Sequence, residues 1–182
     1  MIERELINLN IKTLVVGNLL ENCYILNIDN DYLIVDPGDE TKTILNHIHG
    51  NLLGVLITHY HKDHYGALND ILKYKNVPVY DYKDTDKEIT ISKFKFKVIA
   101  YPGHKEDLVG FLFDDKLFSG DFIFKGTIGR TDLPGGNFKE MQESIKKILV
   151  FKNDLEIYPG HGQSTNLINE RKNLNSYLFK FF

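Results

Sequence analysis

The sequence is poor in cysteine, with Cys23 as the only one in 182 residues. A single cysteine excludes an intrachain disulfide, which fits a protein of the reducing cytosol. Cys23 precedes Tyr24, Ile25 and Leu26, and among such apolar neighbours we expect a buried and unreactive thiol.

Long apolar runs are also missing. No stretch of the sequence is long enough to span a membrane as an apolar helix. Residues 1–10 contain Glu3, Arg4 and Glu5, and these charges interrupt what would be the apolar core of a signal peptide. We therefore expect a soluble, cytoplasmic protein without a membrane partner.

The sequence also has no excess of positive charge. Lys and Arg number 22 against 25 Asp and Glu, so the net charge is -3 and the sequence pI is about 6.2. This balance argues against a nucleic-acid partner, although one or two local cations would still hold a small anionic substrate. The chain has no low-complexity linker and no clear repeat, and its length suits one substantial core. We expect residues 1–182 to form a single domain.

Apolar and β-branched runs alternate along the chain with segments of helical spacing. Strands are predicted at residues 11–16, 22–28, 32–35, 53–57, 77–80, 88–91, 94–101, 109–113, 116–118 and 155–158. Helices are predicted at residues 41–49, 64–75, 138–151 and 166–179, the first with Thr41 as its N-cap. Strands followed by a helix occur twice. This order predicts two αβ halves packed face to face, with sheets inside and helices outside.

Four strong metal ligands lie within six residues, directly after the apolar run at residues 52–57. They are His59, His61, Asp63 and His64. Loops beyond the C-terminal ends of strands are where α/β sheets build their sites, and imidazole with carboxylate suits zinc, iron or manganese. Chance is the alternative, because the chain has seven histidines. His47 and His49 are such a chance pair, and we exclude them because positions i and i+2 face apart on a helix.

Three further polar residues each follow a predicted strand and are directly preceded by glycine. They are His104, Asp121 and His161. Glycine lets the backbone turn so that one side chain points into a shared centre. Each of the three by itself could be an ordinary polar turn residue. With the first four they make seven ligands, the number required by two adjacent metal ions that share one carboxylate.

Asp36 opens the tight turn Asp36-Pro37-Gly38, which follows a predicted strand. The simplest interpretation is a turn aspartate that bonds its own backbone. The alternative is a supporting role beside the metal loop, residues 58–64, which carries the first four predicted ligands.

His-x-His-x-Asp-His, followed by Gly-His, Gly-Asp and a second Gly-His, resembles the pattern of the metallo-β-lactamase superfamily over nearly the whole chain. The resemblance implies an α+β fold, a four-layer αβ/βα sandwich of two mixed β-sheets flanked by helices. It also implies two divalent metal ions, with zinc favoured over iron or manganese. Asp36 then matches a buried aspartate that supports the metal loop, and Asp121 bridges the ions. The other ligands would divide into His59, His61 and His104 for the first ion and Asp63, His64 and His161 for the second.

A narrower resemblance lies in residues 129–136, Gly-Arg-Thr-Asp-Leu-Pro-Gly-Gly, which look like a segment of the hydroxyacylglutathione hydrolase (glyoxalase II-like) branch. It implies hydrolysis of a small-molecule thioester or related acyl substrate by a metal-bridging hydroxide. In this scheme Asp63 orients the hydroxide and Arg130 lies near the substrate. The alternative for this stretch is a plain turn with an internal ion pair between Arg130 and Asp132.

Two features depart from that branch. Lys105 follows His104 where the family usually has threonine, so it brings a charge to the rim of the site. The chain also ends at Phe182, which leaves little room for the C-terminal helical region that supplies glutathione-binding groups in hydroxyacylglutathione hydrolases. The sequence therefore argues against glutathione itself as part of the substrate.

Other activities within the same superfamily are the competing hypotheses. A mononuclear iron persulfide dioxygenase would use only His59, His104 and Asp121, and such enzymes also carry Gly-Arg-Thr-Asp. An RNA-processing nuclease is disfavoured by the acidic balance. A β-lactamase is disfavoured because Gly-Arg-Thr-Asp is foreign to that branch.

Overall fold

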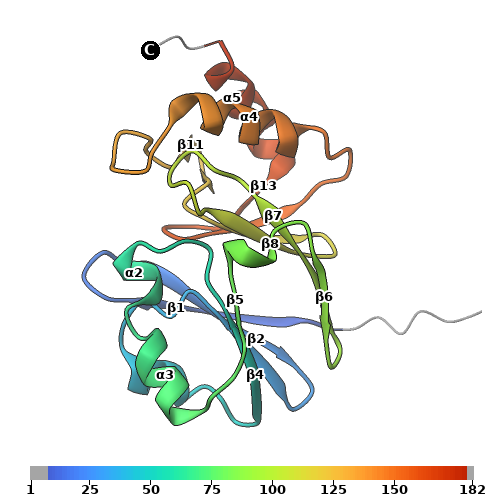
Figure 1. Cartoon of the computed structure of the whole chain (residues 1–182). Coiled ribbons are helices and arrows are strands. Elements are labelled where there is room, and N and C mark those ends of the chain that lie inside the picture. The colour runs from blue at the N-terminus through green and yellow to red at the C-terminus, as the bar shows by residue number, and fades with distance from the viewer. Residues whose placement is uncertain (1–7, 180–182) are drawn as a thin grey trace, which may run out of the picture.

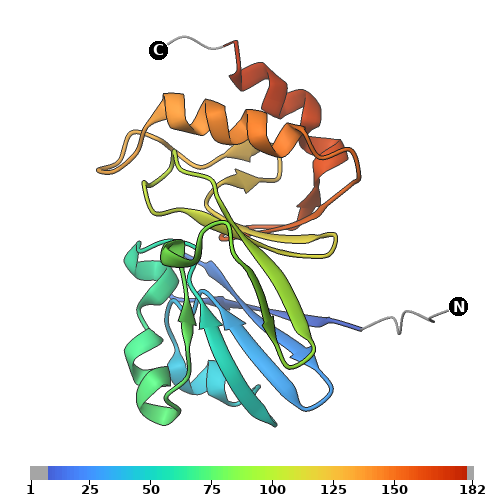
Figure 2. The same ribbon diagram turned by 45° about the vertical axis from the view of Figure 1, so that its right-hand side comes forward.

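Two β-sheets pack face to face between outer layers of helices, as Figures 1 and 2 show. The computed structural model describes residues 8–179. Most of the N-terminal stretch in which we found no signal-peptide pattern lies outside the described residues. The predicted sandwich with its sheets inside and its helices outside is confirmed.

The first sheet has five strands, and their spatial order is their order in the chain. They are β1 (Asn10–Val16), β2 (Glu21–Ile28), β3 (Asp31–Val35), β4 (Asn51–Leu56) and β5 (Val79–Tyr80). The first three form an antiparallel meander, whereas β3, β4 and β5 run parallel. The parallel connections carry three short helices: α1 (Thr41–Leu45), α2 (Lys62–Tyr65) and α3 (Leu68–Tyr74).

The second sheet has six strands in the order β13-β12-β9-β8-β7-β6. Their bounds are β6 (Glu88–Ile91), β7 (Phe94–Ala100), β8 (Val109–Phe113), β9 (Lys116–Gly120), β12 (Glu156–Pro159) and β13 (Thr165–Asn166). β9 and β12 run parallel, and the connection between them carries the hairpin β10 (Ile123–Phe124) and β11 (Thr127–Ile128) and the helix α4 (Phe138–Leu149). The remaining helices are α5 (Leu167–Tyr177) and the single 3-10 turn η1 (Tyr82–Asp84).

Alternation of apolar and polar residues explains how the sheets pack. In β7, Phe94, Phe96 and Val98 are buried between the sheets while the lysines between them are exposed. Tyr24 of β2 meets Phe118 of β9 edge to face, with 5.1 Å between ring centroids. Such a period of two is what a strand needs to bury one face only.

The helices differ from the sequence predictions in their limits. The helix predicted at residues 64–75 is two helices, because Gly66 packs against the carbonyl of Gly38 and Ala67 N–H bonds the carbonyl of Pro37 at 3.0 Å. The helix predicted at 41–49 ends at Leu45. Its N-cap is Glu40, so the assignment to Thr41 is wrong.

Three strands were not predicted: β10, β11 and β13. Each has only two residues. A run this short has no readable alternation, so its pairing depends on the neighbouring chain.

Four strands end at one edge of the sandwich, and this places the predicted ligands. β4, β7, β9 and β12 all direct their C-terminal ends there. Backbone bonds hold the following loops together: Val109 N–H to the carbonyl of Thr58 at 2.8 Å, and Gly160 N–H to the carbonyl of Gly120 at 2.9 Å.

Candidate metal centre

All seven predicted ligands lie together at this edge, in overlapping groups whose donor atoms are within 4.8 Å of one another. One group holds His59, His61 and His104, and another holds Asp63, His64 and His161. His59 and His64 join Asp121 in a third group. His47 lies instead on the surface, with Nδ1 3.1 Å from Nζ of Lys12. Whether the seven bind metal stays a prediction, but their convergence is a fact of the fold.

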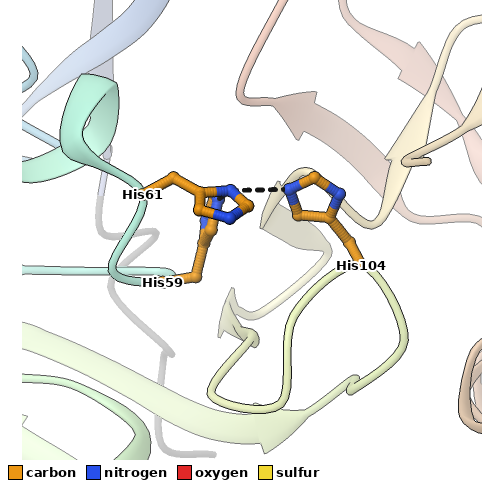
Figure 3. Close-up of side chains that lie close together, drawn as sticks. All are labelled: His59, His61 and His104. Atoms are coloured by element: carbon orange, nitrogen blue, oxygen red, sulfur yellow. Dashed lines mark hydrogen bonds between the residues drawn. The ribbon is translucent and has the colours of Figure 1, made fainter. Parts of the chain in front are cut away.

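The first group brings three ring nitrogens to one point, as Figure 3 shows. Nδ1 of His61 lies 3.0 Å from Nε2 of His59 and 2.9 Å from Nε2 of His104. Two tetrahedral nitrogen ligands on zinc would be about 3.4 Å apart. The spacing therefore needs only a small expansion to receive an ion.

The second group is arranged around a carboxylate. Oδ2 of Asp63 lies 3.3 Å from Nε2 of His161 and 3.7 Å from Nε2 of His64. His161 and Asp63 are partly exposed, whereas His64 is buried. This group thus forms the solvent-facing side of the centre.

Asp121 lies between the two groups and turns one oxygen toward each. Its Oδ2 is 3.4 Å from Nε2 of His104, and its Oδ1 is 3.4 Å from Nε2 of His64. Gly160 makes room for this carboxylate, because a Cβ there would come within 2.3 Å of Oδ1. The two oxygens of Asp121 thus face different groups of donors, as the predicted bridging role requires.

Two buried atoms of the centre find no hydrogen-bond partner among the described residues: Nε2 of His64 and Oδ1 of Asp121. A buried polar atom without a partner is costly, and a native protein leaves few of them. Both atoms face the second group: Nε2 of His64 lies 3.7 Å from Oδ2 of Asp63, and Oδ1 of Asp121 lies 3.8 Å from Nε2 of His161. The residues present therefore fit a pair of divalent ions.

Four histidines have their Nδ1 atoms, which face away from the centre, within hydrogen-bond distance of acceptors outside it. Nδ1 of His64 lies 2.9 Å from Asp36, and Nδ1 of His59 lies 3.1 Å from the Thr58 hydroxyl. Backbone carbonyls hold the other two, Arg130 for His104 at 2.7 Å and Leu19 for His161 at 3.1 Å. Bonds of this kind fix the ring orientation and leave Nε2 facing the centre.

The contacts of Asp36 correct the interpretation of it as a turn residue bonding its own backbone. It is buried and accepts three hydrogen bonds: from Thr58 N–H at 2.7 Å, from the Thr58 hydroxyl at 2.6 Å, and from His64. Asp36 therefore supports the metal loop from behind.

Electrostatics keep most of the donors in the form that binds metal. Burial lowers the pKa of His59 and of His61, so both imidazoles are neutral at pH 7. The hydrogen bond from His161 lowers the pKa of Asp63 to about 2. Burial alone would lower the pKa of His64, but the carboxylates of Asp121 and Asp36 beside the ring outweigh it and raise the pKa.

Glu21 is a buried acidic neighbour of the centre that the sequence did not reveal. Its side chain is 1% exposed, its carboxylate lies 3.8 Å from Nδ1 of His64, and both oxygens lack a hydrogen-bond partner among the described residues. Burial, with Asp36 nearby, raises the pKa of Glu21 to about 10. A glutamate opening an apolar strand is the only signal in the sequence, and it does not distinguish this residue from a surface one.

Arg130 reaches the centre through its backbone. Its guanidinium makes a two-pronged ion pair with Asp132, with both N–O distances 2.8 Å, and the pair is exposed. A contact between the Arg130 side chain and substrate stays a prediction. Lys105 is mostly buried at the rim, with Nζ 2.7 Å from Asp107.

Known proteins that resemble this chain are named as metallo-hydrolases and hydroxyacylglutathione hydrolases. A family model described as the Metallo-beta-lactamase superfamily matches residues 16–90. A probable metallo-hydrolase of Bacillus subtilis (strain 168) is 31% identical, with 86% of this chain and 92% of that protein aligned. A hydroxyacylglutathione hydrolase, GloC, of Haemophilus influenzae is 28% identical over 93% of this chain and 98% of that protein.

Solved structures share the fold closely. The B3 metallo-beta-lactamase BLEG-1 superposes with a TM-score of 0.84 at 28% identity, covering 94% of this chain and all of that one. A protein crystallised in a di-iron-bound form superposes with a TM-score of 0.76 at 29% identity, covering 88% of this chain and 97% of that one. Within residues 8–179, every helix falls short of what crossing a membrane requires.

The length of the Haemophilus relative corrects one inference from sequence. That protein carries the name hydroxyacylglutathione hydrolase, and this chain covers almost all of it. A longer C-terminal region is therefore not a condition for the name, and the length of this chain is no argument against a glutathione thioester.

Proposed function

This chain belongs to the metallo-β-lactamase superfamily and is a metal-binding hydrolase of that group, and we propose that it hydrolyses thioesters or related acyl substrates at a dinuclear centre. The observation that carries the proposal is the position of Asp121, whose two oxygens face different groups of ligands. In a mononuclear site, Asp63, His64 and His161 would converge without binding a metal ion.

The metals of the proposal are two divalent ions, with zinc favoured. His59, His61 and His104 would hold the first, Asp63, His64 and His161 the second, and Asp121 would bridge them. The donor set also accepts iron or manganese, and the structural relative in a di-iron form supports iron as the alternative. When bound, such a pair supplies a hydroxide at neutral pH and an electrophile for the acyl oxygen.

The protein's own residues would position the reactants. Asp63 is ionised and partly exposed, so its carboxylate can accept a hydrogen bond from the attacking water and orient it. Arg130 would hold an anionic or sulfur-bearing part of the substrate. No serine or cysteine nucleophile is needed, and the thiol of Cys23 is buried with a raised pKa.

Metal analysis of natively purified protein, paired with a panel of thioesters that includes S-D-lactoylglutathione, tests the proposal. We expect two metal ions per chain and hydrolysis of at least one thioester. One iron per chain, oxygen uptake with glutathione persulfide and no thioester hydrolysis would instead identify a mononuclear iron dioxygenase. That result would refute the proposal.

A further inference from the structure

An apolar hollow lies against the solvent-facing side of the candidate metal centre. It has a volume of about 470 Å³ and is lined by Val15, Leu19, Leu20, Asn22, His161 and Gly162. His161 belongs to the predicted ligands, so this hollow opens directly onto the second group. The hollow is shallow and open to solvent.

The leucines of the hollow are exposed, although apolar residues of this size are usually buried. Leu19 is 67% exposed, Leu20 is 64% exposed, and Val15 beside them is 57% exposed. Leu20 also has φ at 56°, in the left-handed region that leucine rarely adopts. Exposed apolar side chains on a strained turn beside a reaction centre indicate a contact with a ligand.

Hydrogen bonds from Asn22 connect the turn that carries these leucines to residues 159–162. Asn22 donates its backbone N–H to Gly160 at 2.7 Å, and its side-chain amide to Pro159 at 3.0 Å and to Gly162 at 2.9 Å. The carbonyl of Leu19 holds Nδ1 of His161 at 3.1 Å. The backbone that carries the apolar side chains is therefore anchored beside the centre.

Charge is distributed unevenly around the centre. None of the described residues that line the hollow is Lys, Arg, Asp or Glu, and both protons of the Asn22 amide are already donated. Two cationic residues are instead adjacent to the first group in the chain: the backbone carbonyl of Arg130 bonds His104 at 2.7 Å, and Lys105 follows His104. The apolar part of a substrate thus fits the His161 side, and its polar or anionic part fits the other.

We propose that Val15, Leu19 and Leu20 bind the alkyl chain of the acyl group, so that the preferred substrates are thioesters of apolar acyl chains. This inference rests on the proposed function and names its substrate class. Polar thiol carriers then lie on the side of Arg130 and Lys105.

The test uses acyl thioesters of one thiol, from acetyl to octanoyl, with the metal-loaded protein. We expect kcat/KM to rise by about fourfold for each methylene that the hollow buries. In the double variant Leu19→Asn/Leu20→Asn this dependence should flatten to less than about twofold per methylene. Asparagine adopts the left-handed conformation readily, and the Leu19 carbonyl is kept, so the turn and His161 stay in place. Val150→Asn is the matched control, because Val150 is 77% exposed at the C-cap of α4 and does not line the hollow.

A binding measurement separates this inference from the proposed function. Calorimetric titration of the zinc-loaded protein with alkanoates from propanoate to octanoate needs no turnover. We expect the Kd to fall with chain length in the wild type and in Val150→Asn, and to be independent of length in the double variant at equal metal content.

Three results would overturn the inference. One is an unchanged length dependence in the double variant, or none in the wild type, while thioesters are still hydrolysed. Another is a dependence on the alkyl length of the thiol and not of the acyl group. The third is a dimer that the double variant abolishes, together with a flat alkanoate series. Absence of all thioester hydrolysis refutes the proposed function instead, and the alkanoate titration still decides whether the hollow binds alkyl chains.

Discussion

The carboxylate of Asp36 lies 2.9 Å from Nδ1 of His64, although 28 residues separate the two in the chain. The bond orients the imidazole so that Nε2 faces Asp121 at 3.4 Å. Asp36 also accepts both the backbone and the side-chain protons of Thr58. One buried carboxylate thereby connects the turn after β3 to both ends of the metal loop.

Asp36→Ala should weaken both the centre and the fold. We expect metal affinity to fall about 10–100-fold, because His64 loses the partner that orients it. We expect the free energy of unfolding to fall by about 2–4 kcal/mol, because three buried donors lose their acceptor. Chelator competition and urea denaturation measure the two effects. Asp132→Ala, which removes an exposed carboxylate, is the control, and equal metal affinity in the two variants would contradict the role given to Asp36.

Asp121→Ala should lose most of the bound metal and activity while keeping the fold. The side chain of Asp121 faces His64 and His104 of the centre, so we expect an unchanged circular dichroism spectrum. Elemental analysis after native purification measures the loss. Full metal content in this variant would show that Asp121 does not bridge two ions.

Glu21 should make the metal-free protein less stable as the pH rises. Burial raises its pKa to about 10, whereas a glutamate in the unfolded chain titrates near its ordinary value of 4.5. Between these values the folded state binds more protons at this residue than the unfolded state. The free energy of unfolding contributed by Glu21 therefore falls with pH, by up to about 1.4 kcal/mol per unit.

Replacement of Glu21 by glutamine should remove that slope. In urea titrations of metal-free protein, Glu21→Gln should be more stable than the wild type at pH 8, and the difference should shrink toward pH 5. A difference that is constant over this range would show that Glu21 is ionised in the folded state.

Arg130→Ala tests the predicted contact between the guanidinium and the substrate. Its ion pair with Asp132 is exposed, so we expect almost no change in Tm. If Arg130 binds the substrate, KM should rise about tenfold or more with kcat little changed. Asp132→Ala is the matched control, because it breaks the same ion pair but leaves the guanidinium free. An equal change of KM in both variants would assign the effect to the turn and not to Arg130.

Much of the fold could be predicted from the sequence, because a strand is marked by a pattern of apolar and polar residues that are adjacent in the chain. The alternation in β7 and the apolar run before Thr58 identify strands from a few adjacent residues. The break between α2 and α3 was not readable, because it depends on the approach of Gly66 to a turn 28 residues earlier. The two-residue strands were missed because so short a run has no period.

For the centre, sequence alone specified the kinds of donor and their places after strands. Imidazole and carboxylate carry the same chemistry in any fold, so His59 or Asp121 could be named before the structure was known. Packing settled which nitrogen faces inward, which oxygen of Asp121 meets which group, and that Asp36 and Glu21 lie behind His64. These relationships join segments far apart in the chain. They arise from the way the two sheets bury their inner faces, and no local pattern of residues encodes such distances.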